Sequence, residues 1–118
     1  MPARLWVGEL SLLGGEAQAA LEMARPVTKR RPLQIRGWKL RAAASLALGD
    51  LEDAGRSVAE GVSLDPSDAE LAILGARISA AAGDVDGAIA TLRAYLQVNP
   101  QSAARIEPVL EELFRARG

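Results

Sequence analysis

The sequence predicts an all-α protein built from repeated helix hairpins, and three observations point to this class. The 23 Ala and 17 Leu residues make up 40 of the 118 positions, and both residue types favour helix. Apolar residues recur at spacings of three and four, as in Leu71, Leu74, Ile78 and Ala81. A pattern of glycine, small residues and proline returns after 34 positions, which is typical of helical repeat proteins.

Composition and charge exclude several classes of function. The chain has no Cys and no His, so disulfides, thiolate nucleophiles, zinc fingers and Ser-His-Asp triads are not available to it. A net charge of −1 gives no whole-chain field that selects nucleic acid or an anionic membrane. Glu9 interrupts the N-terminal apolar run, and no run of about 18 uncharged apolar residues follows. We therefore expect a cytoplasmic protein that has no transmembrane segment, cofactor, metal site or catalytic residue.

The repeat is clearest between residues 49–66 and 83–100. The two segments read GDLEDAGRSVAEGVSLDP and GDVDGAIATLRAYLQVNP. Gly49 and Gly83 are expected just past a helix end in the left-handed conformation, and Asp50 and Asp84 are expected to cap the next helix. Ala at the matching positions 54 and 88 allows close helix packing, and proline at 66 and 100 ends each unit.

The apolar spacing predicts seven helices, at 3–14, 17–25, 35–48, 51–64, 68–82, 85–98 and 102–117. Pro26 is expected to break the second helix. Pro108 is expected either to kink the last helix or to start its main part at Glu107. Ser67 and Glu70 form a candidate capping box.

In this register the chain resembles the tetratricopeptide repeat (TPR) family, whose 34-residue unit is a helix–turn–helix. One unit carries the family's aromatic, small and proline marks at Trp38, Ala42, Gly49, Ala54 and Pro66. The next carries them at Ala76, Gly83, Ala88, Tyr95 and Pro100, with Ala72 in place of the early aromatic. The resemblance implies a TPR-like α-α superhelix, a right-handed solenoid of helix hairpins, forming one domain over residues 1–118. Its parts would be a degenerate repeat at 1–34, repeats at 35–68 and 69–102, and a C-terminal capping helix at 103–118.

The resemblance also implies a concave groove that binds a helix or extended peptide of another protein. The groove-facing positions in this chain are Arg36, Lys39, Ala43, Leu46, Ala47, Glu70, Ile73, Arg77, Ala80 and Ala81. Leu5, Glu9, Leu12 and Leu13 would extend the groove at one end and Phe114 at the other. An apolar floor with basic side chains favours an acidic partner segment. The alternative is that Leu12, Leu46 and Ile73 belong to the core.

Some family members clamp a partner's C-terminal carboxylates with Lys and Asn side chains on these helices. Lys39 stands at one such lysine position. Ala43 and Leu74 occupy the asparagine positions, so that class of partner is not expected.

Basic residues gather in one segment, with seven of the 14 between positions 25 and 41 and no acidic residue among them. Besides Arg36 and Lys39, this basic patch contains Arg25, Lys29, Arg30, Arg31 and Arg41. Pro26 and Pro32 predict a loop or an irregular helix end here. The patch is either a binding surface for acidic protein, RNA or acidic membrane, or a solvated loop. Trp38 is the one aromatic in the run, so nucleic acid is disfavoured.

The sequence thus predicts a protein–protein interaction module, such as an adaptor, an assembly factor or a chaperone, and no enzyme. The small chaperones of bacterial secretion systems share this repeat type and size, and the Ala- and Arg-rich composition fits a bacterial source. Anion-surface binding through segment 25–41 is the alternative. About two and a half repeats are near the minimum for stability, so homo-oligomer formation and membership of a longer array both stay open. The paired acids at helix starts, Asp50 with Asp53 and Asp84 with Asp86, are interpreted as caps.

Overall fold

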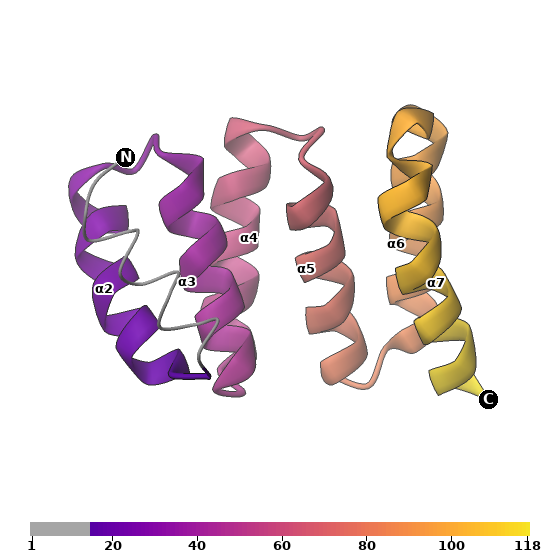
Figure 1. Ribbon diagram of the computed structural model, residues 1–118, viewed down its shortest axis with the longest axis horizontal. Coiled ribbons are helices and arrows are strands. Elements are labelled where there is room, and N and C mark those ends of the chain that lie inside the picture. The colour runs from indigo at the N-terminus through magenta and orange to yellow at the C-terminus, as the bar shows by residue number, and fades with distance from the viewer. Residues whose placement is uncertain (1–14) are drawn as a thin grey trace. The chain divides into compact units, whose positions relative to one another are not determined.

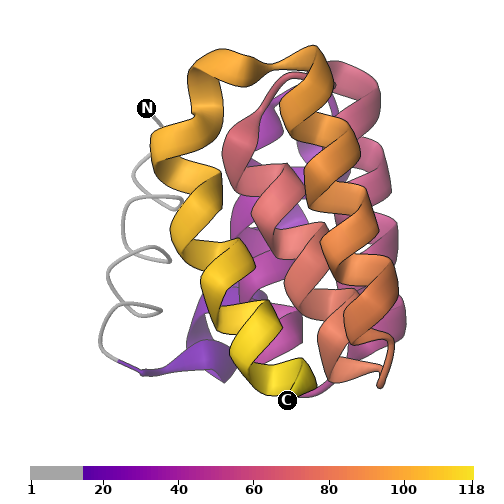
Figure 2. The ribbon, with the colours of Figure 1, turned by 90° about the vertical axis from the view of Figure 1, so that its right-hand side faces the viewer.

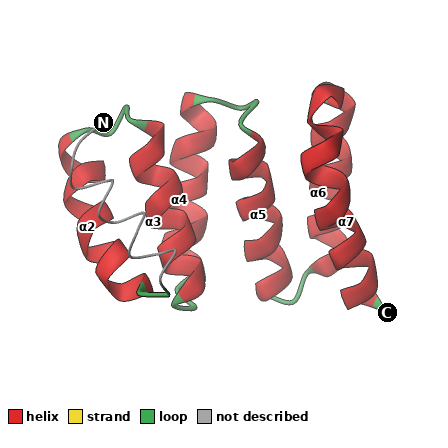
Figure 3. Cartoon of the chain, in the orientation of Figure 1, coloured by secondary structure: helices red, strands yellow, loops and turns green. Residues whose placement is uncertain are grey.

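A computed structural model describes residues 15–118 of the chain, and these residues form helices joined by short turns (Figure 3). The α-helices are α2 (Ala17–Arg30), α3 (Ile35–Ala47), α4 (Leu51–Leu64), α5 (Ala69–Ala81), α6 (Val85–Val98) and α7 (Ala103–Arg117), with a 3-10 turn, η1 (Pro100–Ser102), before α7. No strand occurs in the described range. The helix expected at 3–14 lies outside it. The chain divides into two compact units, Met1–Pro66 and Ser67–Gly118 (Figure 1).

Unit 1 contains α2, α3 and α4, and alanines make up half of its core cluster. Helix α3 packs against both α2 and α4. The core cluster consists of Ala20, Leu21, Ala24, Val27, Leu40 and Ala44. A Cβ added at Gly37 would lie 3.1 Å from Val27 Cγ1, so this glycine allows the close approach of α3 to α2.

Unit 2 contains α5, α6 and α7, which Figure 2 shows side by side. Its core has larger side chains, with Leu92 and Ile106 fully buried beside Ile89, Leu110 and Leu113. Helix α6 packs against both α5 and α7. Burial of side chains of this size is the main source of stability in a helical unit.

The turn that joins the paired helices is the same in both units. Gly49 and Gly83 have φ of +80° and +95°, and the N–H of the following Asp bonds to Ser45 O or Ser79 O at 2.9 Å. This is the Schellman arrangement, which satisfies the last carbonyls of a helix. The Asp50 and Asp84 carboxylates then accept from Asp53 N and Gly87 N. The predicted roles of these two glycines in the turn and of Asp50 and Asp84 as caps are therefore confirmed.

Pro26 does not break the second helix, so the expectation that α2 ends at residue 25 is wrong. The turn after Pro26 stays helical because Val27 and Thr28 are buried. Thr28 Oγ1 also donates to Arg25 O at 2.9 Å, and Arg31 N donates to Val27 O at 2.8 Å. Burial and these bonds outweigh the roughly 3 kcal/mol that an interior proline costs a helix.

Two further expectations about helix starts are corrected. The N-cap of α5 is Asp68, whose carboxylate accepts from Leu71 N at 3.1 Å, whereas the candidate capping box placed Ser67 at that position. Helix α7 begins at Ala103 and contains Pro108, so its main part does not start at Glu107. Buried residues after Pro108, including Leu110 and Leu113, hold the helix together past the proline.

Candidate functional site

The groove positions predicted on α3 form one accessible row in unit 1, which we call the α3 stripe: Arg36, Lys39, Ala43, Leu46 and Ala47. Arg36 and Ala47 are exposed and the other three are partly exposed. The buried residues of the same helix include Gly37, Leu40 and Ala44, on the side that packs in the core. Leu46 is therefore not a fully buried core residue.

The equivalent positions on α5 form the α5 stripe of unit 2: Glu70, Ile73, Arg77, Ala80 and Ala81. Two of these side chains form ion pairs with α7. Arg105 lies 3.5 Å from Glu70, and Glu112 lies 3.5 Å from Arg77. Ile73 packs partly against the unit 2 core, which agrees in part with the alternative interpretation. The cation of this stripe thus already has a carboxylate beside it.

The proposed extensions of the groove have different outcomes. Leu5, Glu9, Leu12 and Leu13 lie outside the described residues. Phe114 packs against the unit 2 core, and the guanidinium carbons of Arg93 and Arg117 lie 5.0 and 5.3 Å from its ring centroid. Two guanidinium groups therefore lie close to the ring of Phe114, which is only partly exposed.

Most of the predicted basic patch lies at the end of α2, which agrees with the expected helix end and not with a loop. Arg25, Lys29 and Arg30 are exposed on α2, and Arg31 is its exposed C-cap. The residues from Arg30 to Gln34 line an open hollow of about 510 Å³ at the turn that leads into α3. Leu33 in this turn is 83% exposed.

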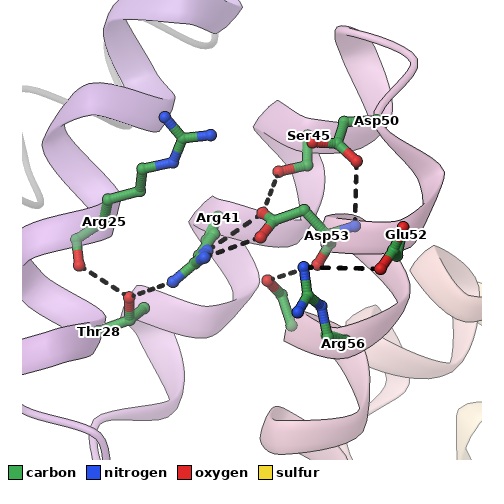
Figure 4. A network of polar contacts seen from close by, with 9 residues as sticks. Arg25, Thr28, Arg41, Ser45, Asp50, Glu52, Asp53 and Arg56 are labelled. Carbon is green, nitrogen blue, oxygen red and sulfur yellow. Dashed lines mark hydrogen bonds and ion pairs between the residues drawn. The ribbon is translucent and has the colours of Figure 1, made fainter.

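Arg41 differs from the rest of that patch because its side chain is turned into unit 1 (Figure 4). It donates two hydrogen bonds to the Asp53 carboxylate, at 2.7 and 3.1 Å, and one to Thr28 Oγ1 at 2.9 Å. Ser45 Oγ donates to the same carboxylate at 2.6 Å. This polar network joins α2, α3 and α4, so Arg41 is a packing residue and not part of an exposed patch.

The network also changes the titration of its acid. The hydrogen bonds from Arg41 lower the pKa of Asp53 from 3.8 to about 2, with a further contribution from Ser45, while burial opposes the change. Two charges that share hydrogen bonds in a partly buried site favour the ionised carboxylate. The expectation that Asp53 acts as a helix cap is therefore wrong, and Asp50 alone has that role at α4.

The two acidic residues at the start of α6 also have structural roles. Asp84 caps α6, whereas Asp86 lies 3.3 Å from Arg117 in an ion pair. Among the described residues, no group of acidic side chains gathers as a metal ion would require. Within the same range, no helix has both the length and the apolar composition needed to cross a bilayer.

Sequence reasoning missed the partnership of Arg41 and Asp53. Both residues were grouped with their neighbours by charge, although they stand 12 positions apart on helices joined by a tight turn. The spacing could have indicated it, because an Arg on the first helix of a hairpin and an Asp early in the second helix can face each other across the tight turn. Trp38 packs within unit 1: it is partly buried, and its Nε1 donates to Pro32 O at 2.7 Å.

Comparison with known proteins identifies the repeat. The family model described as tetratricopeptide repeat matches residues 45–113, which is more than half of the chain. A comparison with curated proteins gave no match.

Three solved structures illustrate the likeness of fold. A thermophilic TPR protein of Thermus thermophilus is 25% identical, with a TM-score of 0.87 over 98% of this chain and 64% of its own. The TPR2B domain of yeast Sti1, solved in a pHsp70 complex, is 22% identical, with a TM-score of 0.79 over 98% and 99%. PcrH, in complex with the chaperone binding region of PopD, is 22% identical, with a TM-score of 0.78 over 98% and 92%. This chain thus spans less than two thirds of the Thermus protein but nearly all of the other two. By its repeat and by its fold, the chain belongs to the tetratricopeptide repeat family.

Proposed function

We propose that the chain is a non-catalytic protein-interaction module in which the α3 stripe of unit 1 and the α5 stripe of unit 2 are each a binding surface for a helix or an extended segment of a partner protein. The carrying observation is that all ten stripe residues are at least partly accessible, whereas the other side of each helix is buried. Accessible rows on a preformed helical scaffold bind partners at little ordering cost. The complexes of the Sti1 domain and of PcrH give the proposal further support.

The chemistry of the stripes favours a partner segment with small contacts and acidic side chains. Ala43 and Ala47 on α3 let another backbone come close, and Arg36 and Lys39 supply positive charge beside them. In unit 2, an acidic partner would compete with Glu112 for Arg77. That exchange costs little, because exposed ion pairs contribute about 0–1 kcal/mol.

The partner segment is proposed to be internal to its chain, not a free C-terminus. A carboxylate clamp of the kind found in the family needs asparagines where this chain has Ala43 and Leu74. An adaptor, assembly factor or chaperone that holds an internal segment in the cytoplasm fits this pattern better.

The test is affinity capture of partners from the native cell with the tagged full-length chain, followed by mass spectrometry. Lys39→Glu and Arg77→Glu each reverse a stripe charge and are expected to lower the recovery of the main partner at least tenfold. Arg56→Glu, at an exposed position of α4, is the matched control and is expected to retain the partner. Circular dichroism checks that each variant is folded. Retention of the partner by both stripe variants would contradict the proposal.

A further inference from the structure

We propose that the turn between α2 and α3 docks on an anionic lipid bilayer. In this arrangement Leu33 enters the membrane interface, and Lys29, Arg30 and Arg31 contact lipid phosphates. The site lies outside the α3 and α5 stripes, so it is independent of the protein-binding function proposed above.

Leu33 lies in a turn that is held by hydrogen bonds. Its side chain is 83% exposed, the highest value among the large apolar residues in the described range. Hydrogen bonds hold the turn on both sides, from Arg31 N to Val27 O at 2.8 Å and from Gln34 N to Arg31 O at 3.0 Å. Trp38 Nε1 fixes Pro32 through a 2.7 Å bond. A fixed apolar tip loses little conformational entropy when it inserts.

Positive charge surrounds this tip. Lys29, Arg30 and Arg31 are all exposed, and no acidic residue occurs between Glu22 and Asp50 in the sequence. Because α2 continues through Pro26, Lys29 and Arg30 lie on its last turn, next to the tip. One acidic residue offsets part of this charge. It is Asp65, the C-cap of α4, and α4 ends on the same side of unit 1 as the turn between α2 and α3 (Figure 1). The balance at this end is therefore positive.

The combination of an apolar tip and cations fits a bilayer better than it fits RNA or an acidic protein. Arg30, Arg31, Pro32 and Leu33 all line the same open hollow, so phosphate and apolar contacts can form together. RNA would need an open aromatic platform, but the ring of Trp38 is partly buried and Arg41 lies 5.7 Å from its centroid. An acidic protein would satisfy the cations but would need a matching pocket for Leu33.

The first experiment measures cosedimentation of the chain with phosphatidylcholine vesicles that contain about 30% phosphatidylglycerol, an anionic lipid that gives the vesicles a negative surface potential. Binding is expected at low salt, with loss at high salt and on pure phosphatidylcholine. Each cation near an anionic surface contributes about fivefold to binding. Arg30→Glu with Arg31→Glu should therefore weaken binding at least about thirtyfold. Arg56→Glu with Arg115→Glu changes the net charge equally on other exposed surfaces and should retain most of the binding.

The second experiment tests insertion of the tip. The chain has no Cys, so Leu33→Cys gives a single site for an environment-sensitive fluorophore. Ala90→Cys, at an exposed position of α6, gives the control site. A blue shift with anionic vesicles is expected at position 33 and none at position 90. In the unlabelled chain, Leu33→Ser should weaken vesicle binding about fivefold.

Several results would overturn the proposal. One is equal binding of the Arg30→Glu/Arg31→Glu variant and the wild-type chain. Another is tighter binding of a single-stranded RNA or of polyglutamate than of the anionic vesicles, which would indicate a general polyanion surface. Absence of a blue shift at position 33, together with full binding by Leu33→Ser, would show that Leu33 does not enter the membrane and would contradict the proposal.

Discussion

The two units share the same helix-joining turn but are held together by different interactions. Half of the core cluster of unit 1 is alanine, and a polar network beside it contains the ion pair between Arg41 and Asp53. Unit 2 has a core of large apolar side chains, and its ion pairs, such as Arg77–Glu112, lie at the exposed edge. A common repeat register thus fixes the backbone turn while leaving the chemistry of the interior free to vary.

The register shows how specific the network is to unit 1. Positions 34 residues after Arg41 and Asp53 are Gly75 and Gly87, so neither charge has a counterpart in the next repeat. Where unit 1 has a guanidinium and a carboxylate, unit 2 relies on the size of Leu92 and Ile106.

The largest effect is expected from truncation of the unit 2 core. Leu92→Ala should lower the free energy of unfolding by about 3 kcal/mol, because Leu92 is fully buried and the mutation leaves a cavity. Val58→Ala at the matching position of unit 1 should cost about 1 kcal/mol, since Val58 is partly exposed and loses fewer atoms. Denaturant unfolding followed by circular dichroism measures both. Equal losses would mean that the two cores contribute alike.

Removal of the buried acid of unit 1 should have the next largest effect. Asp53→Ala leaves Arg41 without its partner and should lower the free energy of unfolding by about 2 kcal/mol, less than for a fully buried pair because the Arg41 side chain is 24% exposed. The control in unit 2 is Glu112→Gln, which removes an exposed pair and should cost under about 0.5 kcal/mol. A loss from Glu112→Gln as large as that from Asp53→Ala would erase the distinction between the units.

The ion pair between Arg41 and Asp53 should also make the free energy of unfolding depend on pH in the acid range. The pKa of Asp53 is lowered to about 2 in the folded chain, below its unfolded value near 3.9. Its contribution is therefore complete above about pH 5 and is lost as the pH falls from 4 towards 2. Over that range the wild-type chain should lose about 2 kcal/mol more stability than Asp53→Asn. Parallel pH profiles of unfolding for the two proteins would show that the carboxylate is not preferentially ionised in the fold.

The smallest effect tests what the units share. Gly49→Ala and Gly83→Ala should each lower the free energy of unfolding by about 1 kcal/mol. Both glycines have positive φ, and no atom lies within 4 Å of the place that an added Cβ would take, so only backbone strain contributes. Thermal unfolding of the two variants should give similar shifts. A clearly larger shift at one site would show that the two turns are not equivalent.

Local signals predicted most of the fold. The 34-residue register located the glycine turns, the Asp caps and the helices from residue 35 onward to within one or two positions. It failed where packing overrides local preference, as at Pro26, because the burial of Val27 and Thr28 cannot be read from local propensity.

The candidate site was less predictable. Sequence alone placed Arg41 and Arg77 with the other cations, but their environments depend on residues distant in the sequence, Asp53 for one and Glu112 for the other. The roles of the α3 and α5 stripes remain predictions, because accessibility alone does not identify a partner.

The Arg41–Asp53 pair has a consequence for which helices pair with one another during folding. Alanine-rich hairpins with nearly identical turns could pair wrongly while the chain folds, which is a characteristic hazard of repeat proteins. If α6 took the place of α4 beside α3, its matching position would offer Gly87, and the guanidinium of Arg41 would be enclosed without a counterion. The charge pair thus penalises that exchange and makes α4 the matching neighbour of α3.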